Sequence, residues 1–232
     1  MFKILLSLFC LFIYNNIVFA ITGEELVKKM EEITKPQDMK SDMELTLINK
    51  KGKQKTMKFR SFIKDQGKKQ IMWFLSPVSD KGISFLKIEK ENKQNKMYMW
   101  LPAFKKIRRI TSKKNSDAFM GSDMSYEDLY NRTENEYTFL IVKEDSLNGN
   151  LCYILETTPK PVLKSSYSKH QSWIIKDSYV PMKELSYDKK GNLLKEKYYK
   201  FSNIGNHKIT KSIEVKNIQK NHTTQLRFNN IQ

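Results

Sequence analysis

The chain has 232 residues, with 42 Lys and Arg against 25 Asp and Glu, a formal net charge of +17, and an apolar content of 39% that includes 12% aromatic residues. The aromatic content argues against a disordered chain, and about 200 residues suffice for one sizeable domain. The absence of an apolar run of about 20 residues excludes a multi-spanning membrane protein. The excess of cations suggests an anionic partner, for which nucleic acid is the first candidate.

The N-terminus argues against nucleic acid. Lys3 gives a positive start, residues 4–13 are apolar, and Val18-Phe19-Ala20 is a small-residue cleavage site. This pattern predicts a secretory signal peptide over residues 1–20 that is cleaved after Ala20. The polar residues 14–16 interrupt the apolar stretch, which disfavours an uncleaved anchor. The mature chain has a charge of +16, and its cations face lipid headgroups, an acidic partner or solvent; we expect no nucleic-acid partner.

Cleavage also removes Cys10 and leaves Cys152 as the single cysteine of the mature chain. No intramolecular disulfide is then available, so the fold depends on its core. Because Cys152 lies in an apolar run, we expect a buried thiol.

A helix is predicted over residues 22–35. Thr22 and Glu25 have the spacing of a capping box, and Pro36 ends the segment. One face of this helix is apolar, with Leu26, Met30 and Ile33.

After the helix the apolar period changes to two, and turn signals such as Asn148-Gly149 separate the runs. The pattern predicts strands near 40–49, 54–64, 69–76, 83–90, 96–101, 105–110, 136–145, 151–158, 171–177, 181–188, 193–202, 208–218 and 222–230. A short helix within residues 121–130, capped by Ser122 or Asp123, interrupts them. No long linker divides the chain, so we expect one mainly β (α+β) domain over residues 21–232.

Three central runs, at residues 71–75, 97–101 and 139–142, are apolar on both faces of their strands. An antiparallel sheet normally leaves one face to solvent, so such strands need cover on both sides. Core packing explains most of this pattern, and an apolar ligand remains an alternative.

The sequence contains few signs of chemistry. It lacks the HExxH, GxSxG, P-loop and GxGxxG motifs, and its three histidines are scattered. We therefore expect no catalytic residues, no metal and no cofactor. Asp123, Glu127 and Asp128 form an acidic cluster that an envelope hydrolase could use, but acids at this spacing are more often solvated or paired with cations.

A basic segment follows the aromatic run that ends at Phe104, and its cations are Lys105, Lys106, Arg108, Arg109, Lys113 and Lys114. It is interpreted either as a docking patch for an anionic membrane surface or acidic partner, or as a solvated edge strand whose charges prevent aggregation. The acidic segment that follows could neutralise part of it.

Two blocks carry a family resemblance. Residues 99–110 with 119–129 resemble the signature of bacterial outer-membrane lipoprotein-sorting proteins of the LolA-like superfamily, and residues 173–183 with 187–191 look like a hairpin of the same family. The resemblance covers essentially the whole mature chain. It implies a single curved antiparallel sheet that forms an incomplete β-barrel, with a concave apolar face covered by short helices.

By the same resemblance, the two predicted helices act as lids through Leu26, Met30, Ile33, Met124 and Leu129. Alternation along the strands suggests a cavity lined by Phe59, Ile71, Trp73, Phe85, Met99, Phe139 and Ile141. The family implies a periplasmic, monomeric carrier that takes lipoprotein acyl chains or another lipid from an inner-membrane transporter and delivers them to an outer-membrane acceptor. A sensor or adaptor of the same fold, reporting envelope stress, is the first alternative.

Overall fold

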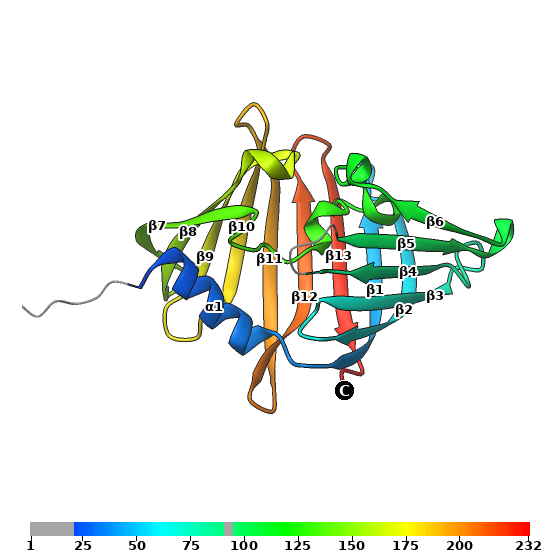
Figure 1. Cartoon of the computed structure of the whole chain (residues 1–232), viewed down its shortest axis with the longest axis horizontal. Helices are drawn as coiled ribbons and strands as arrows, with labels where there is room; N and C mark the ends of the chain where they lie inside the picture. The colour runs from blue at the N-terminus through cyan, green and yellow to red at the C-terminus, as the bar shows by residue number, and fades with distance from the viewer. Residues whose placement is uncertain (1–20, 91–94) are drawn as a thin grey trace, which may run out of the picture.

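The computed structural model describes residues 21–90 and 95–232, so the predicted signal peptide lies outside the described residues (Figure 1). The described chain forms one curved antiparallel sheet of 13 strands that does not close, with a single α-helix, α1 (Gly23–Thr34). The prediction of an incomplete barrel is confirmed. The strands are β1 (Met39–Ile48), β2 (Gln54–Lys64), β3 (Lys69–Ser76), β4 (Ser84–Ile88), β5 (Lys96–Leu101), β6 (Lys106–Ile110), β7 (Tyr137–Leu147), β8 (Asn150–Pro159), β9 (Tyr167–Ile175), β10 (Pro181–Asp188), β11 (Leu193–Ile204), β12 (His207–Asn217) and β13 (His222–Asn229).

The sheet consists of two meanders that meet where the first strand pairs with the last. The spatial order is β6-β5-β4-β3-β2-β1-β13-β12-β11-β10-β9-β8-β7, and Leu45 of β1 lies opposite Leu226 of β13. All other neighbours in the sheet are consecutive in the chain. At the β7–β8 turn, Asn148 and Gly149 have φ angles of 50° and 78°, which suit a two-residue hairpin. The outermost strands are β6 and β7.

The capping box of α1 is confirmed. The Thr22 hydroxyl accepts a hydrogen bond from the Glu25 amide at 3.1 Å, and the Glu25 carboxylate accepts one from the Thr22 amide at 2.9 Å. Leu26 is fully buried against the sheet. At Gly23, a Cβ atom would lie only 2.3 Å from the carbonyl oxygen of Phe139 in β7, so the bare glycine allows the helix to approach the strand.

The concave face is covered by α1 and by the long connection between β6 and β7, which crosses in front of the middle strands (Figure 1). This connection does not contain the predicted helix over 121–130. In and beside this region the connection has single-turn 3-10 helices instead, at Phe119–Gly121 and Glu127–Leu129. Met120 and Gly121 adopt φ angles of 50° and 76°, which break a helical path. The remaining 3-10 turns are Pro102–Phe104, Ser112–Lys114 and Pro161–Leu163.

Two apolar clusters lie on the concave side. The larger one is formed by β1–β6, β12, β13 and the 119–130 cover, and we call this part of the molecule the apolar wing. The smaller one packs Leu26 of α1 against Tyr137, Phe139, Leu155 and Ile174. It belongs to the part built on β7–β11. We call this part the ionic wing, because its concave side also holds paired charges. Cys152 is fully buried here, as predicted.

Candidate functional site

A cavity of about 270 Å³ lies inside the apolar wing, between the sheet and its cover. Its wall is mainly aliphatic, aromatic and thioether. The sheet contributes Met39, Met43, Leu45, Phe59, Ile63, Met72, Ile209, Ile213, Leu226 and Phe228, and the cover contributes Phe119, Met124 and Leu129. Methionine side chains adapt to irregular shapes, so this wall can adjust to a flexible apolar guest.

One end of the cavity is polar. Lys87 of β4 is buried there, and its Nζ atom donates to the Glu89 carboxylate at 2.5 Å and to the Leu129 carbonyl oxygen at 2.9 Å. Burial lowers the pKa of Lys87, although the nearby Glu89 opposes that shift. Lys35, at the end of α1, donates to the Asn131 side chain at 2.9 Å. An amphiphile with a polar end fits this arrangement better than a fully apolar molecule does.

Strand alternation places the cavity wall. In β3, Met72 and Phe74 are buried while Trp73 and Leu75 are exposed, because successive side chains point to opposite faces. In β1, Met43 and Leu45 point inward.

The predicted cavity residues fall into three groups. Phe59 lines the cavity, and Phe85 and Met99 are buried in the same cluster without lining it. Phe139 and Ile141 belong to the cluster under α1. The prediction for Ile71 and Trp73 is wrong, because both lie on the face opposite Met72. A continuous apolar run does not indicate which residues point inward, and a phase error of one position inverts every side chain.

The predicted lid residues are also divided. Met124 and Leu129 of the cover line the cavity. Leu26 and Met30 of α1 pack instead on the cluster of the ionic wing, and Ile33 is half-buried and does not line the cavity. Only the last turn of α1 reaches the cavity, through Thr34 and Lys35.

A buried network of charges, which was not predicted from the sequence, connects the cover to β10 and β11. Asp128 of the cover receives ion pairs from Lys195 at 3.0 Å and Lys197 at 2.7 Å, both on β11. Lys197 also lies 3.0 Å from Glu184 of β10, which pairs with Arg132 at 2.6 Å. The one available signal is the period of two in Lys195 and Lys197, which places both on the same face of a strand.

The pKa directions agree with this charge pattern. Burial alone would raise the pKa of Asp128, but Lys197 and Lys195 outweigh it and hold the pKa well below its usual value. Burial likewise opposes ionisation of Glu184, and Arg132 and Lys197 keep its pKa well below the usual range. Asp128 and Glu184 are therefore ionised at neutral pH.

His170 of β9 is the neutral member of the network. Its Nδ1 atom lies 2.8 Å from the Ser186 hydroxyl and 3.3 Å from the Arg132 guanidinium. Burial and the positive charge of Arg132 lower its pKa well below the usual value.

The three acids considered for a hydrolase are engaged within the fold. Asp128 holds two lysines, as described above. Glu127 accepts hydrogen bonds from Ser165 and from the amide and hydroxyl of Ser166. Asp123 accepts from the Thr224 hydroxyl at 2.7 Å and lies 2.6 Å from Nδ1 of His222. These contacts favour a role in fastening the cover to the sheet.

The predicted basic patch lies at the free edge of the sheet, on β6 and the loop after it. Lys105, Lys106, Arg108, Arg109 and Lys113 are exposed, whereas Lys114 is half-buried and pairs with Asp117 at 2.9 Å. Asp128 of the acidic segment pairs instead with the lysines of β11. Docking patch and solvated edge both remain compatible with the structure.

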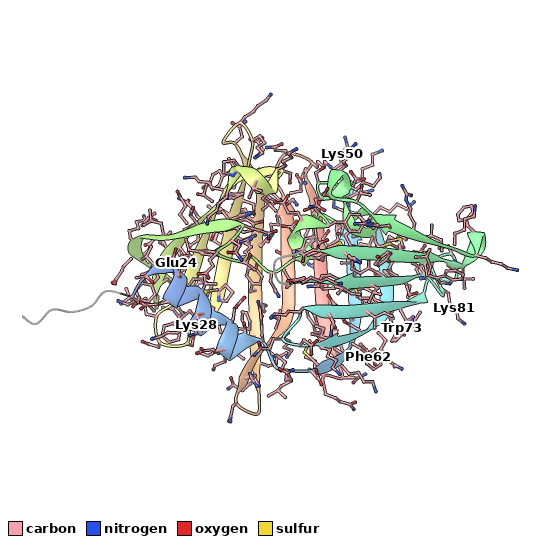
Figure 2. The ribbon with its side chains drawn as sticks, in the orientation of Figure 1. Glu24, Lys28, Lys50, Phe62, Trp73 and Lys81 are labelled. Atoms are coloured by element: carbon pink, nitrogen blue, oxygen red, sulfur yellow. The ribbon has the colours of Figure 1, made fainter. Side chains whose placement is uncertain are left out.

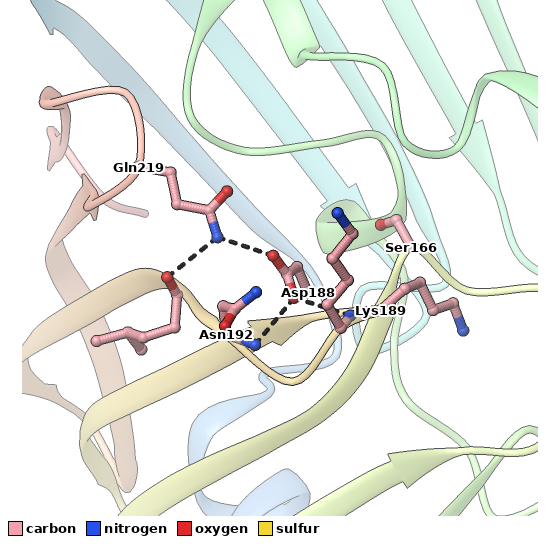
Figure 3. A pocket seen from close by; sticks show the side chains of 7 residues that line it. Ser166, Asp188, Lys189, Asn192 and Gln219 are labelled. Carbon is pink, nitrogen blue, oxygen red and sulfur yellow. Dashed lines mark hydrogen bonds between the residues drawn. The ribbon is translucent and has the colours of Figure 1, made fainter.

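A second hollow, of about 640 Å³, opens to solvent between the β10–β11 and β12–β13 turns (Figure 3). Asp188 is its centre, accepting hydrogen bonds at 2.9 Å from the Lys190 and Asn192 amides and from the Gln219 side chain. These bonds join the two turns. The polar lining and open shape of this hollow do not suit an acyl chain.

Within residues 21–90 and 95–232, no group of three or more His, Cys, Asp and Glu side chains is arranged to hold a metal ion. In the same described ranges, no helix has the length and hydropathy needed to span a membrane.

Comparison with known proteins agrees with this geometry. A family model with the description "-like: Uncharacterized protein" matches residues 66–232, and the chain belongs to that family. A domain assigned to outer-membrane lipoprotein sorting from Vibrio parahaemolyticus superposes with a TM-score of 0.84 at 27% identity, covering 90% of this chain and 91% of that one. The chain shares the fold of this lipoprotein-sorting domain.

Two further solved structures have the same fold. A DUF1329 family protein from Desulfovibrio piger has a TM-score of 0.84 at 28% identity, with 90% of this chain and 91% of that chain covered. A LolA superfamily protein from Nitrosomonas europaea, with a TM-score of 0.75, 18% identity and coverage of 92% and 94%, shares the fold. No protein with a curated description matches the sequence.

Proposed function

We propose that this chain is a periplasmic carrier that holds a lipoprotein acyl chain, or the acyl chain of another lipid, in the cavity of the apolar wing. It receives this cargo from an inner-membrane transporter and delivers it towards the outer membrane. The observation that carries the proposal is the 270 Å³ cavity with its aliphatic and methionine wall. The similarity to lipoprotein-sorting proteins supports it and favours a binding protein over an enzyme.

Apolar burial is sufficient to hold such a cargo. Each methylene group that leaves water contributes about 0.8 kcal/mol, so ten methylenes give about 8 kcal/mol before the entropy of immobilisation is subtracted. The cargo is therefore held without a covalent bond. Release requires only that the acceptor offer a comparable apolar site.

The polar end of the cavity suits the head of the lipid. Lys87 and Lys35 present cations there, and Asn131 adds an amide. These groups are suited to an ester, carboxylate or phosphate at the end of the chain, while the tail lies along Leu45, Met72 and Leu226.

Purified protein tests the proposal directly. Mature protein prepared without detergent should yield a lipid in organic extracts analysed by mass spectrometry, and delipidated protein should take up a fluorescent fatty acid. Met72→Trp fills the cavity and should weaken uptake at least about tenfold. Leu75→Trp is the matched control, because it places the same side chain on the outer face of the same strand.

The thermal midpoints of both variants show whether they fold, and Met43→Phe provides a milder filling of the same cavity. Wild-type protein that contains no lipid and takes up none contradicts the proposal. Equal uptake by folded Met72→Trp and Leu75→Trp variants contradicts the assignment of this cavity.

A further inference from the structure

The outer face of β2–β6 carries a group of neighbouring apolar side chains, with Arg60 and Arg109 at the ends of its rows. The pairing register places Phe62, Ile71, Leu86 and Tyr98 in one row across β2–β5. A second row runs across β3–β6 through Trp73, Ser84, Trp100 and Ile107. These side chains point outward. The side chains that alternate with them along the same strands point inward and form the core and the cavity. We call these two rows, with Leu75, the outer apolar face.

Much of this face is open to solvent. Trp73 is 40% exposed and Ile107 is 69% exposed. Phe62 and Trp73 stack edge to face with ring centroids 5.2 Å apart, and both point outward at the same end of the sheet (Figure 2). Exposed apolar residues are ordinary when scattered, but a contiguous group of aromatic and aliphatic side chains marks a binding surface.

The loops at the end of this face continue it. The β3–β4 and β5–β6 turns lie side by side, because a Cβ atom on Gly82 would be 3.5 Å from the Pro102 ring. Their tips expose Val78 and Phe104, at 90% and 70%. Two adjacent loop tips thus present apolar side chains that the fold itself does not bury.

Beside this face, the positively charged side chains outnumber the negatively charged ones. Each nearby acid is already paired, with Asp42 bound to Arg60, Asp65 to Lys69 and Asp80 to Lys55. Lys81, Lys105 and Lys106 border the two loop tips and form no ion pair with any described residue. The surface therefore combines exposed apolar groups with uncompensated positive charge.

The outer face of the ionic wing differs. There the Trp173 ring is covered by the Lys183 ammonium at 5.3 Å, and the Tyr198 ring lies under Lys183 and Lys216 at 5.6 Å and 5.2 Å. Cations placed over the rings keep that surface polar. On that wing cations cover these aromatic rings, whereas Trp73 and Ile107 of the outer apolar face stay open to solvent.

We propose that the outer apolar face and its two loop tips dock on the anionic surface of a membrane. Aromatic side chains favour the headgroup region, aliphatic tips enter the acyl boundary, and free lysines bind anionic headgroups. An acidic protein would match the lysines but offers no reason for Val78 and Phe104 at protruding tips. The proposal assigns a role to part of the basic patch and is independent of what the cavity holds.

Vesicle flotation tests the proposal. Mature protein should float with vesicles of equal parts phosphatidylcholine and phosphatidylglycerol, and much less with phosphatidylcholine alone. The double variant Val78→Ser/Phe104→Ser should bind the anionic vesicles at least about tenfold more weakly, as should Lys105→Glu/Lys106→Glu. The thermal midpoint should hardly move, since all four side chains are exposed.

Leu140→Ser is the matched control, because Leu140 is 62% exposed on β7 at the opposite edge of the sheet. It should bind vesicles as the wild type does. Wild-type protein that ignores anionic vesicles overturns the proposal, as does a tip variant that binds normally or a Leu140→Ser variant that loses binding equally. Loss of an envelope protein partner by the tip variants, without any vesicle binding by the wild type, also overturns it in favour of a protein interface.

Discussion

The two wings share one sheet, and in both the side chains alternate between its two faces. Their interiors differ, because one is apolar and the other contains paired charges. In the apolar wing, phenylalanine and methionine side chains such as Phe59 and Met72 surround a cavity. In the ionic wing, Glu184 and Lys197 form a charged pair in the equivalent concave space, and Lys197 also pairs with Asp128 of the cover. A buried ionic network requires all of its partners in fixed positions, whereas a methionine-rich wall repacks at small cost.

This difference suggests a division of labour. The ionic wing fixes the curvature of the sheet and anchors the cover through Asp128, while the apolar wing keeps room for a guest. A cavity next to a rigid frame is less prone to collapse than one surrounded by adaptable side chains alone. If this is so, substitutions in the two wings should differ in how much they lower the free energy of unfolding and in how that loss depends on pH.

The largest effect is expected from Glu184→Gln. The substitution removes the carboxylate that pairs with the half-buried Arg132 and one of the two that pair with the buried Lys197, which costs about 3–5 kcal/mol of the free energy of unfolding. Urea denaturation measures it. Glu44→Gln is the control: Glu44 pairs with Lys58 at 3.7 Å on the surface, and its loss should cost less than about 1 kcal/mol. Equal costs for the two variants would remove the distinction between the network and a surface pair.

A similar loss of about 3–5 kcal/mol, with a different signature, is expected from Phe85→Ala in the apolar wing. Phe85 is fully buried, and its ring centroid lies 5.1 Å from that of Phe119. Because the loss is that of apolar packing, it should be the same at pH 5.5 and pH 7.5. A loss that changes strongly between these pH values would show that the wings are coupled electrostatically.

Gly23→Ala tests how α1 is seated over the ionic wing. The new Cβ would lie 2.3 Å from the carbonyl oxygen of Phe139, so the helix must shift, at a cost of about 1–3 kcal/mol. Hydrogen exchange of the α1 amides should accelerate. Glu24→Ala changes the exposed neighbour and should alter stability by less than about 0.5 kcal/mol. Slow exchange retained in Gly23→Ala would contradict this seating.

The smallest effect is a dependence on pH that His170 confers. Its pKa is lowered in the folded protein, so its contribution is complete above the unfolded value of about 6.5 and is lost as the pH falls. The free energy of unfolding should therefore decrease by up to about 1.4 kcal/mol per pH unit below that value.

Arg132, Glu184, Lys197 and Asp128 are the charged groups around this histidine. The depressed pKa values of the two carboxylates add a loss of stability only below about pH 4. Urea midpoints between pH 7.5 and 5.5 therefore isolate the histidine. His170→Gln should flatten the slope, and an unchanged slope would assign it to another group.

Much of the fold was predictable from local signals. Alternation and turn residues such as Asn148-Gly149 place all thirteen strands, and Thr22 with Glu25 places the helix. The site was less predictable. In the run 71–75 both faces are apolar, so no local property decides that Met72 points inward and Trp73 outward. The network could not be predicted because Asp128 and Lys197 are 69 residues apart and meet only where the cover crosses the concave face of the sheet.

The two ends of the open sheet carry a final consequence. A free strand edge exposes unpaired amides and carbonyls that invite another chain to join the sheet. At β7, the start of α1 packs on the backbone at Phe139 and Leu140 and obstructs such an addition. At β6, the charged residues Lys106 and Arg108 repel a second copy of the same strand. Strand addition is thus hindered sterically at the β7 edge and by charge repulsion at the β6 edge. Only the charge repulsion should weaken as salt is added.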